Sequence, residues 1–123
     1  MNKLNILYYE QNKIKRKVRY EIFRKFFKEI FTCYTNKDCI EILKDNEIKL
    51  IIMSEFKPIT TCYELIHEIR AIDIDIPIYI SGSMNNFHEE VTKDPHIKFC
   101  NHSNGNINFI KILDSVKEDF GTN

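Results

Sequence analysis

The side chains that could carry chemistry stand directly after four short apolar runs of this 123-residue chain. They are carboxylates, an amide, hydroxyls and an imidazole: Glu10-Gln11, Ser54-Glu55, Ser81 and His102. Carboxylate oxygens suit a hard cation, and a serine hydroxyl becomes a nucleophile only when a base activates it. These residue types therefore allow an ion site at Glu10, phosphorylation of Ser54, or a hydrolytic pair made by Ser81 and His102.

Each of these chemical roles competes with a simpler structural one. No GxSxG turn surrounds Ser81, and the sequence places no orienting acid beside His102, so the pattern does not favour hydrolysis and we expect no enzyme. The Glu10-Gln11 pair fits a polar turn as well as it fits an ion site. For Ser54 we favour a buried or half-buried hydroxyl over a phosphorylation site.

Cysteine and histidine spacing does not predict a metal centre. The four cysteines form no CxxC pair, and the four histidines fall at no zinc-like spacing. No apolar run approaches the roughly 18 residues of a membrane span, and the N-terminus lacks a signal-peptide core. We therefore expect a cytoplasmic protein whose thiols are reduced and packed as small apolar groups.

Short apolar runs alternate with segments of helical periodicity along the chain. The predicted strands cover residues 4–9, 31–34, 50–53, 76–80 and 97–100, and the predicted helices cover about 14–30, 39–43, 65–72, 85–93 and 107–120. Thr35 or Asn36 is a plausible N-cap, and residues 61–64 form a capping box. The pattern predicts one α/β domain over residues 1–123, with a doubly wound five-stranded parallel sheet and five helices of the flavodoxin-like type. In such sheets the working site lies beyond the carboxyl ends of the strands, which gathers the polar residues around one crevice.

Four blocks at these strand ends carry a family resemblance. They are ILYYEQN at residues 6–12, LIIMSEFKP at 50–58, IPIYISG at 76–82 and KFCNHS at 98–103. Over the whole chain, with near-normal spacing between blocks, the sequence resembles the receiver domains of bacterial two-component response regulators.

The resemblance implies a phosphorylation pocket in which several functional positions have changed. Typical receivers use two neighbouring acids and an acceptor Asp to hold Mg²⁺, together with a hydroxyl and a lysine. Here those positions read Glu10, Gln11, Ser54, Ser81 and His102. The resemblance thus implies a degenerate receiver, or pseudo-receiver, that forms no aspartyl phosphate and holds neither Mg²⁺ nor another cofactor. Glu55 is a poor substitute acceptor because adjacent strand residues point to opposite faces.

Charge is unevenly distributed along the chain. The 18 basic and 18 acidic residues cancel, yet residues 12–30 hold eight bases against two acids. Apolar residues recur at every fourth position from Ile14 through Val18 and Ile22 to Ile30, which predicts one broad apolar face with the bases mostly on the other. The simplest interpretation of the bases is a solvated helix face. In the resembling family this first helix docks a histidine kinase or phosphotransfer protein, which makes Lys15, Arg16 and Arg19 candidates for a partner surface. Nucleic-acid binding is not favoured, because one basic helix without stacking aromatics gives little specificity.

Three phenylalanines belong to a second candidate surface. The resemblance places Phe99 at a rotating aromatic switch, although a strand phenylalanine is more often core. It also implies that the fourth helix, fifth strand and fifth helix contact an output domain or a second copy, through Phe87, Phe99 and Phe109.

Together these features predict a phosphorylation-independent protein-interaction module. Two alternatives are left open: a phosphoacceptor that uses a non-standard residue, and a small-ligand or cofactor binder of the flavodoxin-like type. The turn at residues 10–13 lacks the Gly/Ser/Thr character that cradles a phosphate, which weighs against a flavin-like site.

Overall fold

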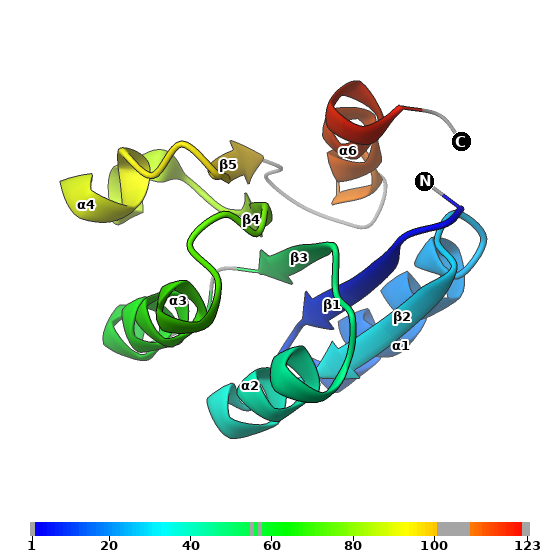
Figure 1. The fold of residues 1–123 in the computed structure, drawn as a ribbon, viewed down its shortest axis with the longest axis horizontal. Helices are drawn as coiled ribbons and strands as arrows, with labels where there is room; N and C mark the ends of the chain where they lie inside the picture. The colour runs from blue at the N-terminus through cyan, green and yellow to red at the C-terminus, as the bar shows by residue number, and fades with distance from the viewer. Residues whose placement is uncertain (1, 55, 57, 101–108, 122–123) are drawn as a thin grey trace.

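Five parallel strands form one sheet in the computed structural model, which describes residues 2–54, 56, 58–100 and 109–121. The strands are β1 (Asn5–Tyr9), β2 (Glu29–Cys33), β3 (Leu50–Ser54), β4 (Ile78–Ser81) and β5 (Ile97–Cys100). Their order is β2-β1-β3-β4-β5, with β3 at the centre between β1 and β4 (Figure 1). The almost uninterrupted apolar sequence of β3 suits a central strand that is covered on both faces. The predicted doubly wound sheet is confirmed.

Helices cover both faces of this sheet. They are α1 (Lys13–Phe23), α2 (Asn36–Asp45), α3 (Ile59–Ile72), the short 3-10 turn η1 (Met84–Asn86), α4 (Glu89–Thr92) and α6 (Ile112–Phe120). One core layer joins the sheet to α2, α3 and α4, and the other joins it to α1 and α6. No helix within the described residues is long and apolar enough to cross a membrane.

Strand alternation decides which polar residues share a face. Tyr8 and Ile52 belong to the core layer under α1 and α6, whereas Tyr9 and Met53 belong to the opposite layer. Side chains two residues apart on a strand point to the same side. The alternation therefore places Glu10 and Ser54, each two residues further on, on the α1–α6 face.

The predicted first helix, residues 14–30, is too long, and its expected apolar face is only partly right. Phe23 and Phe27 are buried, and Ile22 packs against the same core layer. Helix α1 ends at Phe23, because Lys28 N donates to Leu4 O at 2.9 Å and the following residues pair with β1 as strand β2. The predicted core residues Ile14 and Val18 are 75% and 39% exposed. The side of α1 that faces the sheet carries Phe23 and the buried Arg19, which the pattern did not predict there.

Other helix boundaries also differ from prediction. Helix α3 starts at Ile59 after the extended residue Pro58, so the capping box at residues 61–64 does not begin it. The predicted fourth helix is divided into η1 and α4, and the start of the predicted last helix lies outside the described residues. Thr35 is confirmed as the N-cap of α2, since its Oγ1 accepts from Asp38 N at 3.1 Å.

The four cysteines are buried with free thiols, as predicted: Cys33, Cys39, Cys62 and Cys100. A hydrogen bond with Cys39, together with burial, raises the pKa of the Cys33 thiol. A protonated, buried thiol packs as a small apolar group and is a poor nucleophile.

Candidate functional site

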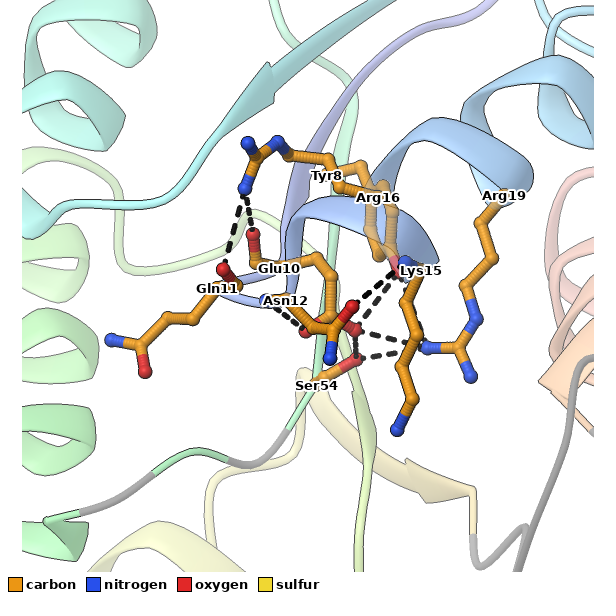
Figure 2. A network of polar contacts seen from close by, with 8 residues as sticks. All are labelled: Tyr8, Glu10, Gln11, Asn12, Lys15, Arg16, Arg19 and Ser54. Carbon is orange, nitrogen blue, oxygen red and sulfur yellow. Dashed lines mark hydrogen bonds and ion pairs between the residues drawn. The ribbon is translucent and has the colours of Figure 1, made fainter.

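The carboxylate of Glu10 is the centre of a buried polar cluster at the end of β1. Only 6% of Glu10 is exposed. Its Oε1 accepts hydrogen bonds from Ser54 Oγ at 2.8 Å, Arg19 Nη1 at 3.0 Å and the Tyr8 hydroxyl at 3.2 Å, and its Oε2 accepts from Asn12 N at 3.0 Å (Figure 2). A buried charge is tolerated when it is paired and hydrogen-bonded in this way.

Arg19 supplies the positive charge of this cluster. Asn12 caps α1 by accepting from Lys15 N at 2.9 Å, which fixes the helix so that Arg19 lies on its inward side, four residues before Phe23. Arg19 is 6% exposed, and its guanidinium carbon lies 3.7 Å from the centroid of the Phe109 ring. An ion pair with Glu10 and a cation–π contact thus hold this side chain on both sides.

Ser54 and Tyr8 complete what we call the Glu10–Arg19 cluster, consisting of Tyr8, Glu10, Arg19 and Ser54. Arg19 Nη1 also donates to the Tyr8 hydroxyl at 3.3 Å and to Ser54 Oγ at 3.4 Å. Burial raises the pKa of the Tyr8 phenol well above its usual value, and the Glu10 carboxylate adds to the rise. The phenol therefore stays protonated at physiological pH and remains a hydrogen-bond donor to Glu10.

Ser81 lies next to this cluster across the sheet. The parallel register of β3 and β4 pairs Ser54 directly with Ser81, and both residues are half-buried. The two hydroxyl positions predicted from the strand ends are therefore neighbours. His102 and Glu55, the other two residues proposed from sequence, lie outside the described residues.

Gln11 does not join the cluster. Its side chain is exposed and points away from Ser54, and its Nε2 donates to the Tyr9 hydroxyl at 3.4 Å (Figure 2). Arg16 holds the same turn by donating to Glu10 O at 2.8 Å, and its guanidinium lies 4.5 Å from the Tyr34 ring centroid. These contacts fix the turn, and the Glu10 carboxylate points into the buried cluster.

The described donor set does not fit a hard divalent cation. Mg²⁺ prefers several oxygen ligands in octahedral geometry, commonly with one or two carboxylates. Within the described part of the chain no three His, Cys, Asp or Glu side chains come together in a way that could hold a metal ion. The Glu10 carboxylate is already engaged by Arg19, whose positive charge would repel an added cation.

The structure corrects three of the residues predicted for partner surfaces. Arg19 is buried in the Glu10–Arg19 cluster, while Phe87 and Phe109 are 8% and 1% exposed and pack in the two core layers. Phe99 is half-buried with its ring centroid 5.0 Å from that of Phe87, in line with the core interpretation. Lys15 is exposed, and Arg16 is half-buried against Tyr34.

The sequence did not predict that Arg19 and Tyr8 belong to the cluster: it placed Arg19 on a partner surface and gave Tyr8 no role. Residues 12–30 contain eight bases, so charge alone did not single out Arg19. It stands four residues before the buried Phe23 and so shares its helix face. Tyr8 stands two residues before Glu10 on the same strand face. The four-residue spacing of Arg19 and Phe23 and the two-residue spacing of Tyr8 and Glu10 could have predicted that Arg19 and Tyr8 join the cluster.

Comparison with solved structures identifies the fold. CheY4, a chemotaxis response regulator of Vibrio cholerae, superimposes with a TM-score of 0.71 at 14% identity, covering 93% of this chain and 98% of that one. A response regulator receiver protein from Sinorhizobium medicae gives 0.68 at 14% identity, covering 94% and 95%. A chain from the complex of the histidine kinase ThkA with the response regulator TrrA gives 0.71 at 18% identity, covering 95% and 98%.

These similarities define the class of fold. The chain has the flavodoxin-like receiver fold of these neighbours, with its five parallel strands in one sheet. The amino-acid sequence matches no protein-family model, and no significant match to a curated protein is found. At identities below 20% the likeness is one of fold, so the function has to be argued from the site itself.

Proposed function

We propose that this chain is a receiver-fold domain of two-component signalling that acts as a protein-interaction module without phosphorylation of an aspartate. The fold it shares with CheY4 and with a chain of the ThkA–TrrA complex supports the signalling role. The observation that carries the proposal is the buried ion pair between Glu10 and Arg19 beside Ser54.

The chemistry of phosphoryl transfer explains why this ion pair matters. Transfer needs an acceptor and positive charge placed around the moving phosphoryl group, normally with Mg²⁺. Ser54 offers a hydroxyl in place of a carboxylate, and the Arg19 guanidinium already neutralises Glu10. A pocket that satisfies its own charge has no electrostatic need for a bound metal ion. In this proposal the cluster is a fixed structural element, and signalling depends on surfaces elsewhere.

The exposed side of α1 is the surface we assign to an acidic partner. Ile14 and Val18 are exposed one helical turn apart, and Lys13, Lys15 and Lys17 are exposed around them. The ion pairs of the described residues include none of these three lysines. An apolar strip with basic neighbours suits an amphipathic, acidic helix such as a histidine kinase or phosphotransfer protein could offer.

Intact-mass spectrometry after incubation with acetyl phosphate and Mg²⁺ tests the proposal. We expect no phosphorylated species that is lost on acid or hydroxylamine treatment, because the acceptor position carries a hydroxyl. Glu10→Gln serves as the comparison, since it removes the carboxylate without adding an acceptor. An acid-labile phosphate on the wild-type protein would contradict the proposal.

A second candidate function is phosphorylation of Ser54 itself. It is favoured by one contact, the 2.8 Å hydrogen bond that Ser54 Oγ donates to the Glu10 carboxylate, which could accept the hydroxyl proton. Acid-stable phosphate that disappears in Ser54→Ala would establish this function in place of the first. A small-ligand or cofactor site stays a prediction, and a colourless purified protein would exclude a flavin.

A further inference from the structure

A groove between α2 and α3 is the surface that the proposed function leaves unused. It has a volume of about 570 Å³, and its lining comes from both helices. Ile40, Ala71 and Ile72 form its apolar part, and Ile72 is 40% exposed. Ile74, just beyond the end of α3, is 71% exposed. Large aliphatic side chains exposed together are typical of a contact surface.

Charged side chains of both signs surround this apolar part. Lys37, Glu41 and Lys44 come from α2, and Glu68 comes from α3. All four are exposed, and the ion pairs within the described ranges include none of them. The groove therefore combines two unpaired bases and two unpaired acids around aliphatic groups, with no net charge.

Such a surface is complementary to itself. In a two-fold symmetric contact the same patch lies on both sides, so it must offer both members of each attractive pair. The groove meets this condition with two acids, two bases and a shared apolar centre. The exposed side of α1 does not, because its lysines would face lysines of the second copy.

We propose that the α2–α3 groove is the interface of a two-fold symmetric homodimer of this chain. In it Ile40 and Ile72 of two copies pack together, and the bases of each copy face the acids of the other. This places self-association on α2 and α3, whereas the homodimer through the fourth helix, fifth strand and fifth helix stays a prediction. Two of the aromatic residues predicted for that face, Phe87 and Phe109, are buried in the core. The proposal rests on the groove and is independent of the signalling function.

Charge-swap variants studied by sedimentation velocity test the homodimer. We expect wild-type protein to show a concentration-dependent monomer–dimer equilibrium. Lys37→Glu/Lys44→Glu makes the four charges acidic, and Glu41→Lys/Glu68→Lys makes them basic. Each variant alone should dissociate at least tenfold more readily than wild type, because like charges then face one another. An equimolar mixture of the two variants should associate again as a heterodimer.

Controls separate this interface from general charge effects. Lys15→Glu/Lys17→Glu on α1 should leave the dimer unchanged, and Ile72→Gln should weaken it without altering net charge. Circular dichroism verifies that each variant is folded. A wild-type protein that stays monomeric up to about 1 mM, where association would be worth only about 4 kcal/mol, would overturn the proposal. So would two swapped variants that dimerise like wild type or fail to associate when mixed.

Discussion

At the scale of single residues, the pairing of Glu10 with Arg19 determines what the polar cluster at the strand ends can do. A carboxylate at this position could have been an open ligand. Instead it accepts four hydrogen bonds from within the chain, one of them from a buried guanidinium. A buried ion pair whose hydrogen bonds are made within the chain keeps its two side chains in place, because separating them would leave a buried charge without a partner.

Substitution of Arg19 tests how much the stability of the fold depends on the Glu10–Arg19 ion pair. Arg19→Ala leaves the Glu10 carboxylate buried without its cation, so we expect a loss of about 3–5 kcal/mol in the free energy of unfolding. The double variant Glu10→Gln/Arg19→Met should recover most of that loss, because it removes both charges and keeps the volume filled. Urea denaturation followed by circular dichroism measures both. Equal destabilisation by the single and double variants would show that packing, and not charge pairing, dominates.

The residue scale also shows where sequence reasoning stops. The alternation of strands and helices correctly predicted that Glu10, Ser54 and Ser81 gather at one edge, since the carboxyl ends of parallel strands lie on the same side of a sheet. The sequence pattern of the first helix did not show that Arg19 points inward, because the i, i+4 series of Ile14 and Val18 predicted a different buried side for α1. Burial of the arginine depends on Glu10 and Phe109, which lie 9 and 90 residues away in the sequence.

At the scale of elements, Arg70 ties α3 to the segments that precede β4 and β5. Its Nε donates to Asp94 Oδ2 at 2.6 Å, and its Nη1 donates to Ile76 O at 2.9 Å and to Asp73 O at 3.0 Å. Partial burial acts to raise the pKa of Asp94. Hydrogen bonds from Arg70 and from the His96 backbone outweigh burial and hold that pKa below its usual value.

This ion pair predicts an acid-dependent part of the stability. A carboxyl group whose pKa is lowered by folding stabilises the protein above its unfolded pKa of about 3.9 and loses that effect as pH falls through the folded pKa. Asp94→Asn should therefore cost about 1–3 kcal/mol at pH 7. The difference from wild type should shrink below about pH 4. Thermal unfolding of both proteins between pH 7 and pH 3 provides the measurement, and a constant difference would contradict this role for Asp94.

Tyr63 holds the segment between η1 and α4 against α3. Its hydroxyl donates to Asn86 O at 3.2 Å and accepts from His88 N at 2.9 Å, and its ring stacks on His88 with centroids 4.8 Å apart. This contact interrupts the helix that the sequence predicts over residues 85–93, because Phe87 and His88 are held in extended conformations.

Tyr63→Phe should loosen this segment without disturbing the core. The ring and its packing remain, but the two hydrogen bonds are lost, so we expect about 1 kcal/mol of destabilisation. Amide hydrogen exchange should accelerate about fivefold or more at His88 and stay unchanged in β1 and β3. Unchanged exchange at His88 would mean that packing alone positions the segment.

At the scale of the whole molecule, the zero net charge does not show how the charges are distributed. The exposed side of α1 is basic, the α2–α3 groove carries both signs, and Glu10 and Arg19 form a buried ion pair. Of the eight bases at residues 12–30, Arg19 is used inside the fold and Arg24 pairs with Glu21 at 2.9 Å. The exposed lysines of α1 form a surface of one sign, and the α2–α3 groove carries both signs. The two surfaces that we propose for a partner of opposite charge and for a second copy lie on opposite faces of the sheet.

The measurement that tests the central claim most directly is an amide chemical-shift titration with Mg²⁺ and beryllofluoride, a phosphoryl mimic. Wild-type protein should show no saturable shifts at Glu10, Ser54 and Ser81, because Arg19 already neutralises the crevice. The matched variant Arg19→Met/Ser54→Asp places two carboxylates side by side without that cation, and it should acquire saturable Mg²⁺-dependent shifts there. Saturable changes centred on Ser54 and Ser81 in the wild-type protein would contradict the account.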